Sequence, residues 1–189
     1  MSETHFCGAL ILAITFLLIV RYSLRKENSF LNIREIACDY WKMLSSLGHR
    51  VIFMATPISF GIGLTLISPI RTSVLETVCT AISILLGLLF ATLGAIASGN
   101  AKKEKDYPAY GTVFNETINI ILYLSCLSIA DLVVLFIGLA LVPLSGTLPQ
   151  SCIAVLHSIG SVTVYSLTFS IFLNCLIVIK RIARLLTIG

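Results

Sequence analysis

Long apolar runs separated by short polar segments dominate the chain. Five such runs cover residues 6–20, 51–70, 78–98, 118–143 and 153–179. About 20 apolar residues in a helix cross the hydrocarbon core of a bilayer, and a helix satisfies its own backbone hydrogen bonds there. The pattern predicts an all-α, polytopic transmembrane bundle of five spans in one integral membrane domain over residues 1–189. The first run is the shortest, about 22 Å at about 1.5 Å per residue, so Arg21 after it must snorkel or the bilayer must thin.

A different pattern, with polar and apolar positions alternating at helical spacing, covers residues 29–48. The polar positions, three and four residues apart, are Asn32, Glu35, Asp39, Lys42 and Ser46. The apolar positions, at the same spacing, are Ile33, Ala37, Tyr40, Leu44 and Leu47. This periodicity predicts an amphipathic helix, with Ser29 as N-cap and Gly48 as its stop.

Two compatible interpretations of this amphipathic helix follow. It lies on the inner membrane surface, where Tyr40 and Trp41 suit the headgroup region. It also offers residues 27–50 as a docking surface for a cytosolic partner protein. The candidate surface residues for the membrane or the partner are Glu35, Asp39, Trp41 and Lys42.

The distribution of Lys and Arg predicts the orientation. The segments after spans one, three and five carry six, three and three of these residues, whereas the other side carries only Arg71. Because basic loops stay in the cytoplasm, the N-terminus is expected outside and the C-terminus inside, in the inner (plasma) membrane.

Composition excludes a soluble domain. Charged residues make up 12% of the chain and hydrophobic residues 57%, with a mean hydropathy of +1.00, against roughly 25% charged residues in soluble domains. The net charge of +4 is explained by helix orientation, so we expect no direct nucleic-acid partner. The six cysteines are scattered and show no metal-ligand spacing, so we expect no metal site and no cofactor.

Asp131 is the only acidic or basic residue well inside a long apolar run. A carboxylate there costs about 2.5–3.5 kcal/mol on insertion scales, so it needs a partner, a proton or water. Spans four and five are joined by a short segment and should pack antiparallel, which brings residues 163–168 to the depth of residue 131. Tyr165 is the first expected partner, followed by Ser166 and Thr163.

The sequence is compatible with three roles for Asp131. It holds two helices together through a hydrogen bond to span five, or it lines a water-filled path in an oligomer with polar residues of that span, among them Ser161. In the third, Asp131, Tyr165 and His157 relay protons or ions in a transporter, although five spans show no internal repeat of the kind that transporters use. His157, near a span end, is more typical of a solvated interfacial histidine.

Small residues recur every four positions in the third span. They are Ser83, Gly87, Ala91 and Ala95. Small side chains at this spacing let another helix approach closely. Spans two and three are therefore expected to form a tight hairpin, or the small residues form a contact between copies of the chain.

Catalysis is not expected. The chain carries no HExxH, GxSxG or phosphate-binding glycine loop, and no second intramembrane aspartate for proteolysis by an Asp pair. We therefore expect a protein that is not an enzyme.

The segment AISILLGLLFATLGAIAS, after a span with internal Pro and Gly, resembles small multi-spanning proteins encoded beside bacterial anti-phage defence genes. The resemblance covers residues 51–98 and transfers no functional residues. It implies a membrane effector or sensor that disrupts the inner membrane when a cytosolic partner signals infection, acting on the basic inner face and residues 29–48. Small phage lysis proteins are similar in style. The alternatives are a small ion-coupled transporter and a membrane anchor subunit for a soluble partner.

Overall fold

The computed structural model describes residues 14, 21, 33–44, 47–99, 108–141 and 150–188, and every regular element among them is a helix. The helices are α2 (Ile33–Met43), α3 (Leu47–Ile67), α4 (Thr72–Gly99), α5 (Pro108–Leu141) and α6 (Gln150–Ile188). The last four are long and apolar enough to cross a membrane. The first predicted span, residues 6–20, lies outside the described residues except for Ile14.

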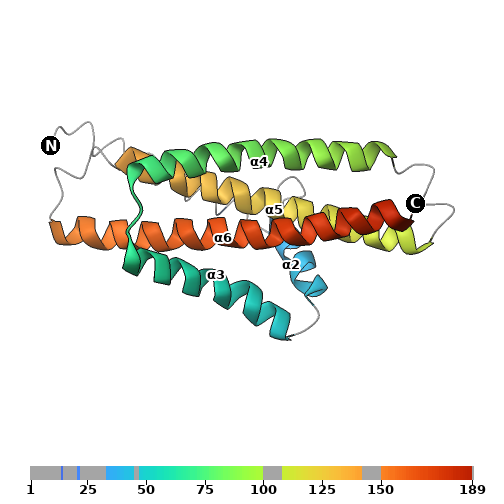
Figure 1. The fold of residues 1–189 in the computed structure, drawn as a ribbon, viewed down its shortest axis with the longest axis horizontal. Coiled ribbons are helices and arrows are strands. Elements are labelled where there is room, and N and C mark those ends of the chain that lie inside the picture. Colours follow the sequence, from blue (N-terminus) through green and yellow to red (C-terminus); the bar gives the residue numbers. More distant parts are fainter. Residues whose placement is uncertain are drawn as a thin grey trace.

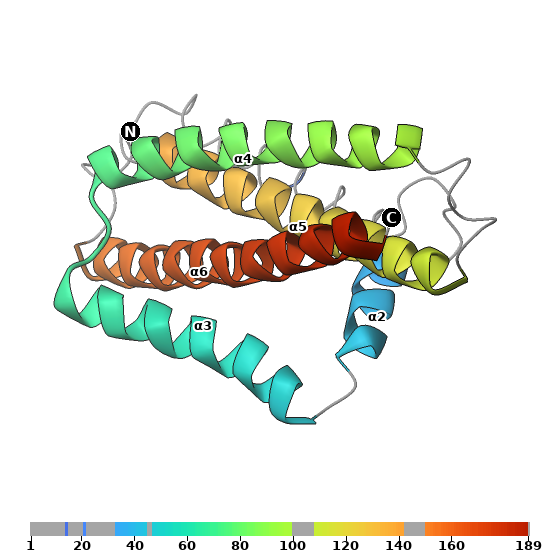
Figure 2. The ribbon, with the colours of Figure 1, turned by 45° about the vertical axis from the view of Figure 1, so that its right-hand side comes forward.

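The longest helices, α5 and α6, run antiparallel along the middle of the molecule, and α4 and α3 lie on opposite sides of this pair (Figures 1 and 2). α4 packs on α5, α3 packs on α6, and the short helix α2 packs on α5. The expected tight hairpin of spans two and three is therefore wrong. A connection over residues 68–71 joins α3 to α4, but each helix packs on a different member of the central pair.

The core lies along α5. Its residues Ile120, Ile121 and Leu124 are buried at the centre of a cluster that includes Ile82 and Leu89 of α4. A second cluster, around Leu135, continues this contact toward the other end of α5. On α4, Leu75, Ile82 and Leu89 are buried at seven-residue spacing, as expected for two helices that pack along their length.

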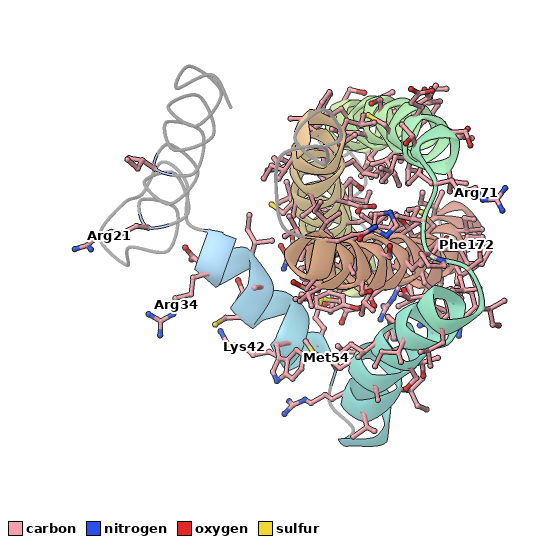
Figure 3. All side chains as sticks on the ribbon, turned by 90° about the vertical axis from the view of Figure 1, so that its left-hand side faces the viewer. Arg21, Arg34, Lys42, Met54, Arg71 and Phe172 are labelled. Carbon is pink, nitrogen blue, oxygen red and sulfur yellow. The ribbon has the colours of Figure 1, made fainter. Side chains whose placement is uncertain are left out.

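The outer surfaces of the helices are strongly apolar. Leu66 and Ile67 at the end of α3 are 82% exposed, and large side chains of α4 and α6 such as Ile84 and Phe172 also point outward (Figure 3 labels Phe172). Such a surface would be unstable in water but suits contact with lipid chains. The fold agrees with the expectation of an all-helical bundle whose helices can span a membrane.

Each of the four long helices begins before the apolar run that predicted it. Pro108 is the first residue of α5, and Gly111 lies in its first turn. Proline is tolerated at a helix start because the first N–H groups have no intrahelical acceptor. Gly48, the expected stop of the amphipathic helix, instead lies in α3, and α2 ends at Met43.

Candidate functional site: the polar contacts of α6

Polar side chains spaced along α6 contact the other described elements. We call them the α6 polar row, and they are Ser161, Tyr165, Thr168, Asn174 and Arg181. From the N-terminal to the C-terminal end of α6, they contact the α3–α4 connection, the second half of α5, α2 and the start of α5. The row therefore connects the separate packing layers of the bundle.

Asp131 of α5 is fully buried, with 0% exposure, and its Oδ2 accepts a hydrogen bond of 3.0 Å from Oγ1 of Thr168. Its other oxygen, Oδ1, is also buried and has no hydrogen-bond partner among the described residues. The antiparallel packing of α5 and α6 agrees with the expected depth. The expected partners were wrong, because Thr168 takes the place proposed for Tyr165, Ser166 or Thr163.

The rotation of α6 explains this difference. Thr168 lies on the α6 face that includes the buried residues Val164 and Ile171, whereas Tyr165 donates to the backbone oxygen of Ser68 at 3.3 Å. Ser166 faces α3, and Thr163 donates to the carbonyl of Ile159 in its own helix at 2.8 Å. Depth along a helix can be counted from its ends, but the direction of each side chain depends on packing.

The α3–α4 connection is held on α6 near the N-terminal end of that helix. The hydroxyl of Ser161, fully buried, accepts from the backbone N–H of Ile70 at 3.1 Å and donates to the carbonyl of His157 at 2.7 Å. The bond from Tyr165 to Ser68 holds the same connection. The His157 side chain itself is exposed and makes no contact with Asp131 that would support a relay.

α3 approaches α6 closely at Gly61. A Cβ atom at this position would lie 2.1 Å from Oγ of Ser166 and 2.7 Å from the carbonyl oxygen of Val162. Phe60 stacks on Phe169 next to this point, with ring centroids 4.1 Å apart. Gly61 was noted in the sequence only as part of a Pro- and Gly-containing span. Its spacing alone gives no signal that distinguishes it from Gly63, where a Cβ would meet nothing within 4 Å.

The contact of α2 with the bundle depends on Tyr40, which is 4% exposed. Its hydroxyl donates to Oδ1 of Asn174 at 2.6 Å, and its ring stacks on Tyr123 of α5 with centroids 3.8 Å apart and planes 5° apart. Asn174 is 1% exposed and donates through Nδ2 to the carbonyl of Ser170. The sequence placed Tyr40 on the apolar face of the helix but gave no sign that Asn174 and Tyr123 would receive it.

The opposite side of α2 is open to solvent. Arg34, Glu35 and Lys42 are exposed, and Figure 3 shows Arg34 pointing away from the bundle. Lys42 pairs with Asp39 at 2.9 Å, and this hydrogen bond raises the pKa of Lys42. All four of the candidate surface residues therefore lie on one short helix, with Trp41 half-buried.

Two further contacts link neighbouring elements at this end of the molecule. Nε of Arg50, in α3, donates to the carbonyl of Leu44 at 2.7 Å, and its guanidinium lies 5.7 Å from the ring centroid of Trp41. Arg181 of α6 forms an ion pair with Glu116 of α5. Arg50 thus ties α2 to the beginning of α3, and Arg181 ties the two central helices together.

The small residues of α4 lie outside the packing among the helices that the structure describes. Ser83, Gly87, Ala91 and Ala95 are all exposed, and a Cβ at Gly87 would meet nothing within 4 Å. Larger residues of α4 fill the contact with α5. In the described part of the chain, these residues therefore make no close contact with another helix of the same copy.

No family model matches this chain. No curated protein and no solved structure matches it significantly either. Among the described residues, no group of three or more His, Cys, Asp and Glu side chains could hold a metal ion, and Cys38, Cys79, Cys126 and Cys175 are free thiols. What the described geometry offers is a set of interhelical attachments, one of which joins a charged surface helix to the spanning helices.

Proposed function

We propose that this protein is an oligomeric effector or sensor of the bacterial inner membrane that alters membrane permeability in anti-phage defence, without enzymatic activity. The observation that carries the proposal is the attachment of α2. A helix with a charged, exposed side is fixed through Tyr40 to α5 and α6, so a protein that binds α2 acts directly on helices able to span the membrane. The resemblance of residues 51–98 to defence-associated membrane proteins supports the biological setting.

The proposed topology has five spans, with the N-terminus outside and the C-terminus inside. Lys and Arg are concentrated on the side that includes residues 21–50, 99–117 and 180–184, and this bias supports a cytoplasmic position for α2. A cytosolic partner at residues 27–50 is compatible with this orientation.

The proposed oligomer contact is the exposed row of small residues on α4. Small residues permit close approach of helices in a membrane, and here they lie opposite the α4 face that packs on α5. In the proposed assembly, Asp131 fastens α5 to α6 within each copy, because its buried carboxylate already bonds to Thr168.

Depolarisation of cells tests the proposal. Inducing the protein in bacteria together with a potential-sensitive dye should collapse the membrane potential and arrest growth. Expression of an equal amount of a variant truncated after α3 controls for membrane load. Full potential at high expression, with or without infection, would contradict the permeability function.

A small ion-coupled transporter is the alternative that one specific observation favours, namely the unpartnered Oδ1 of Asp131. In a carrier, Asp131→Asn should shift the pH dependence of ion uptake into vesicles. In the proposed effector the same variant should leave depolarisation intact, because asparagine still accepts the hydrogen bond from Thr168. A membrane anchor would instead cause no leakage and would co-purify with a soluble partner through residues 27–50.

A further inference from the structure

We propose that Tyr40 is an autoinhibitory latch, which holds α2 on the bundle in the closed protein and is withdrawn when a partner binds the outer side of α2. This inference rests on the proposed function and adds the regulation of permeability to it. The latch has two parts, the hydrogen bond from the Tyr40 hydroxyl to Asn174 and the stacking of the two rings of Tyr40 and Tyr123.

The attachment of α2 is concentrated on this one residue. Among the described side chains of α2, Tyr40 alone is buried, and the others are half-buried or exposed. Met43 and Leu44 pack against the same apolar cluster only partly buried. Tyr40 is therefore the most deeply buried point at which α2 meets the bundle, and its hydroxyl donates to Asn174 of α6.

A displacement of α2 would be passed to α3. Arg50 bonds to the carbonyl of Leu44 and lies over Trp41, so the start of α3 follows the end of α2. Pro57 lies inside α3 and leaves one carbonyl of the helix without its usual N–H donor, which makes this a favoured point of bending. Beyond Pro57, Gly61 and the Phe60–Phe169 stack hold α3 firmly on α6. The first half of α3 can thus move about Pro57 while the second half stays in place.

Acidity does not open this latch. Burial, and then the neighbouring Tyr123, raise the pKa of Tyr40 above its ordinary value of about 10. Because the folded value is raised, the stabilisation from this group is complete below about pH 10 and is lost only as the pH rises further. At physiological pH the phenol stays neutral, so the release has to come from binding at α2.

The chain supplies its own reporter for the position of α2, since Trp41 is its only tryptophan. We compare Tyr40→Phe, which removes one hydroxyl and keeps the ring, with Thr163→Val as the control. Thr163 donates to the carbonyl of Ile159 in its own helix, so its variant loses one hydroxyl without removing a bond between elements. Purified full-length proteins in dye-loaded vesicles allow Trp41 quenching by acrylamide and dye leakage to be measured on the same sample.

The expected result is that Tyr40→Phe increases the undocked fraction of α2 about fivefold, the effect of losing one ordinary hydrogen bond. Trp41 becomes more accessible to acrylamide and basal leakage rises in proportion, while Thr163→Val matches the wild type in both. Asn174→Leu removes the acceptor of the same hydrogen bond and keeps Tyr40, so it should reproduce the Tyr40→Phe result. Agreement between the two variants shows that the effect comes from the lost bond and not from another change in one of them.

Two outcomes overturn the latch. Trp41 quenching in Tyr40→Phe and Asn174→Leu equal to the wild type would show that Tyr40 does not hold α2. Increased quenching without increased leakage would show that undocking does not open the membrane path. Failure of the proposed function is recognised separately, because then wild-type protein causes no depolarisation in cells at any expression level, whatever Trp41 reports.

Discussion

At the scale of single residues, the polar groups of the bundle fall into two kinds. Most hydroxyls, such as those of Thr65, Ser125 and Ser128, donate to the carbonyl four residues earlier in their own helix. Asp131 and Asn174 instead receive a hydrogen bond from another helix. The second kind fixes how helices are placed relative to one another, as the ion pair of Arg181 with Glu116 also does, and it includes the two residues that matter most to the proposals above.

The bond between Thr168 and Asp131 can be tested by Thr168→Val, which keeps the shape and removes the hydroxyl. Interhelical hydrogen bonds in membranes average about 0.6 kcal/mol, so we expect the free energy of unfolding to fall by at least that amount. The loss is somewhat larger because neither oxygen of the buried Asp131 carboxylate then accepts a hydrogen bond. Unfolding in mixed micelles with increasing SDS measures it. Thr163→Val is the control, because Thr163 bonds only to its own helix. Equal stability of the two variants would contradict a structural role for the pair.

Gly61 offers a second test at this scale. Gly61→Ala places a methyl group against Ser166 and against the backbone of Val162, so α3 has to move away from α6. Overpacking of this kind costs about 1–3 kcal/mol, which the same SDS titration resolves. Gly63→Ala is the control, because space is open there and alanine favours the helix. A neutral result at Gly61 would mean that the two backbones do not approach closely.

At the scale of elements, hydropathy located the four described spans but not their neighbours. α3 and α4 are apolar on nearly all sides, so the sequence pattern does not indicate which face of either helix packs against a neighbour. Their order in the chain therefore suggested a hairpin of α3 with α4. The structure pairs α3 with α6 instead, through a glycine contact that has no hydrophobic signature. The amphipathic helix was better determined, because its period defined which side would be buried, and Tyr40 is indeed the buried residue of α2.

The small residues of α4 give a prediction at this scale. Gly87→Leu should leave the monomer intact, because a side chain at Gly87 meets no neighbour within 4 Å, and it should prevent close contact between copies. Chemical cross-linking in native membranes measures the loss of oligomer. Ala81→Leu adds bulk at another exposed position of α4 and should cross-link like the wild type. Unchanged cross-linking of Gly87→Leu would exclude α4 as the contact.

At the scale of the whole molecule, orientation depends on charge more than on packing. The bias of Lys and Arg predicts that residue 189 and the loop over residues 99–107 share the cytoplasmic side, with residues 145–151 outside. Fusions of alkaline phosphatase and of green fluorescent protein at residue 189 and within residues 145–151 check this. Fluorescence at residue 189 and phosphatase activity within 145–151 are expected. Phosphatase activity at residue 189 would overturn the topology.

Two of the contacts between helices join segments that are synthesised at different times. Tyr40 and Asn174 are 134 residues apart in the chain, and Gly61 meets Ser166 only after most of the protein has been synthesised. Because α3 and α4 enter the membrane on their own hydropathy, both have to remain there without α6 until the last span follows. A nascent chain that has not yet reached residue 174 has no acceptor for Tyr40. In the proposed latch mechanism, the closed form is therefore the last to be assembled during biosynthesis, and every copy passes first through an unlatched state.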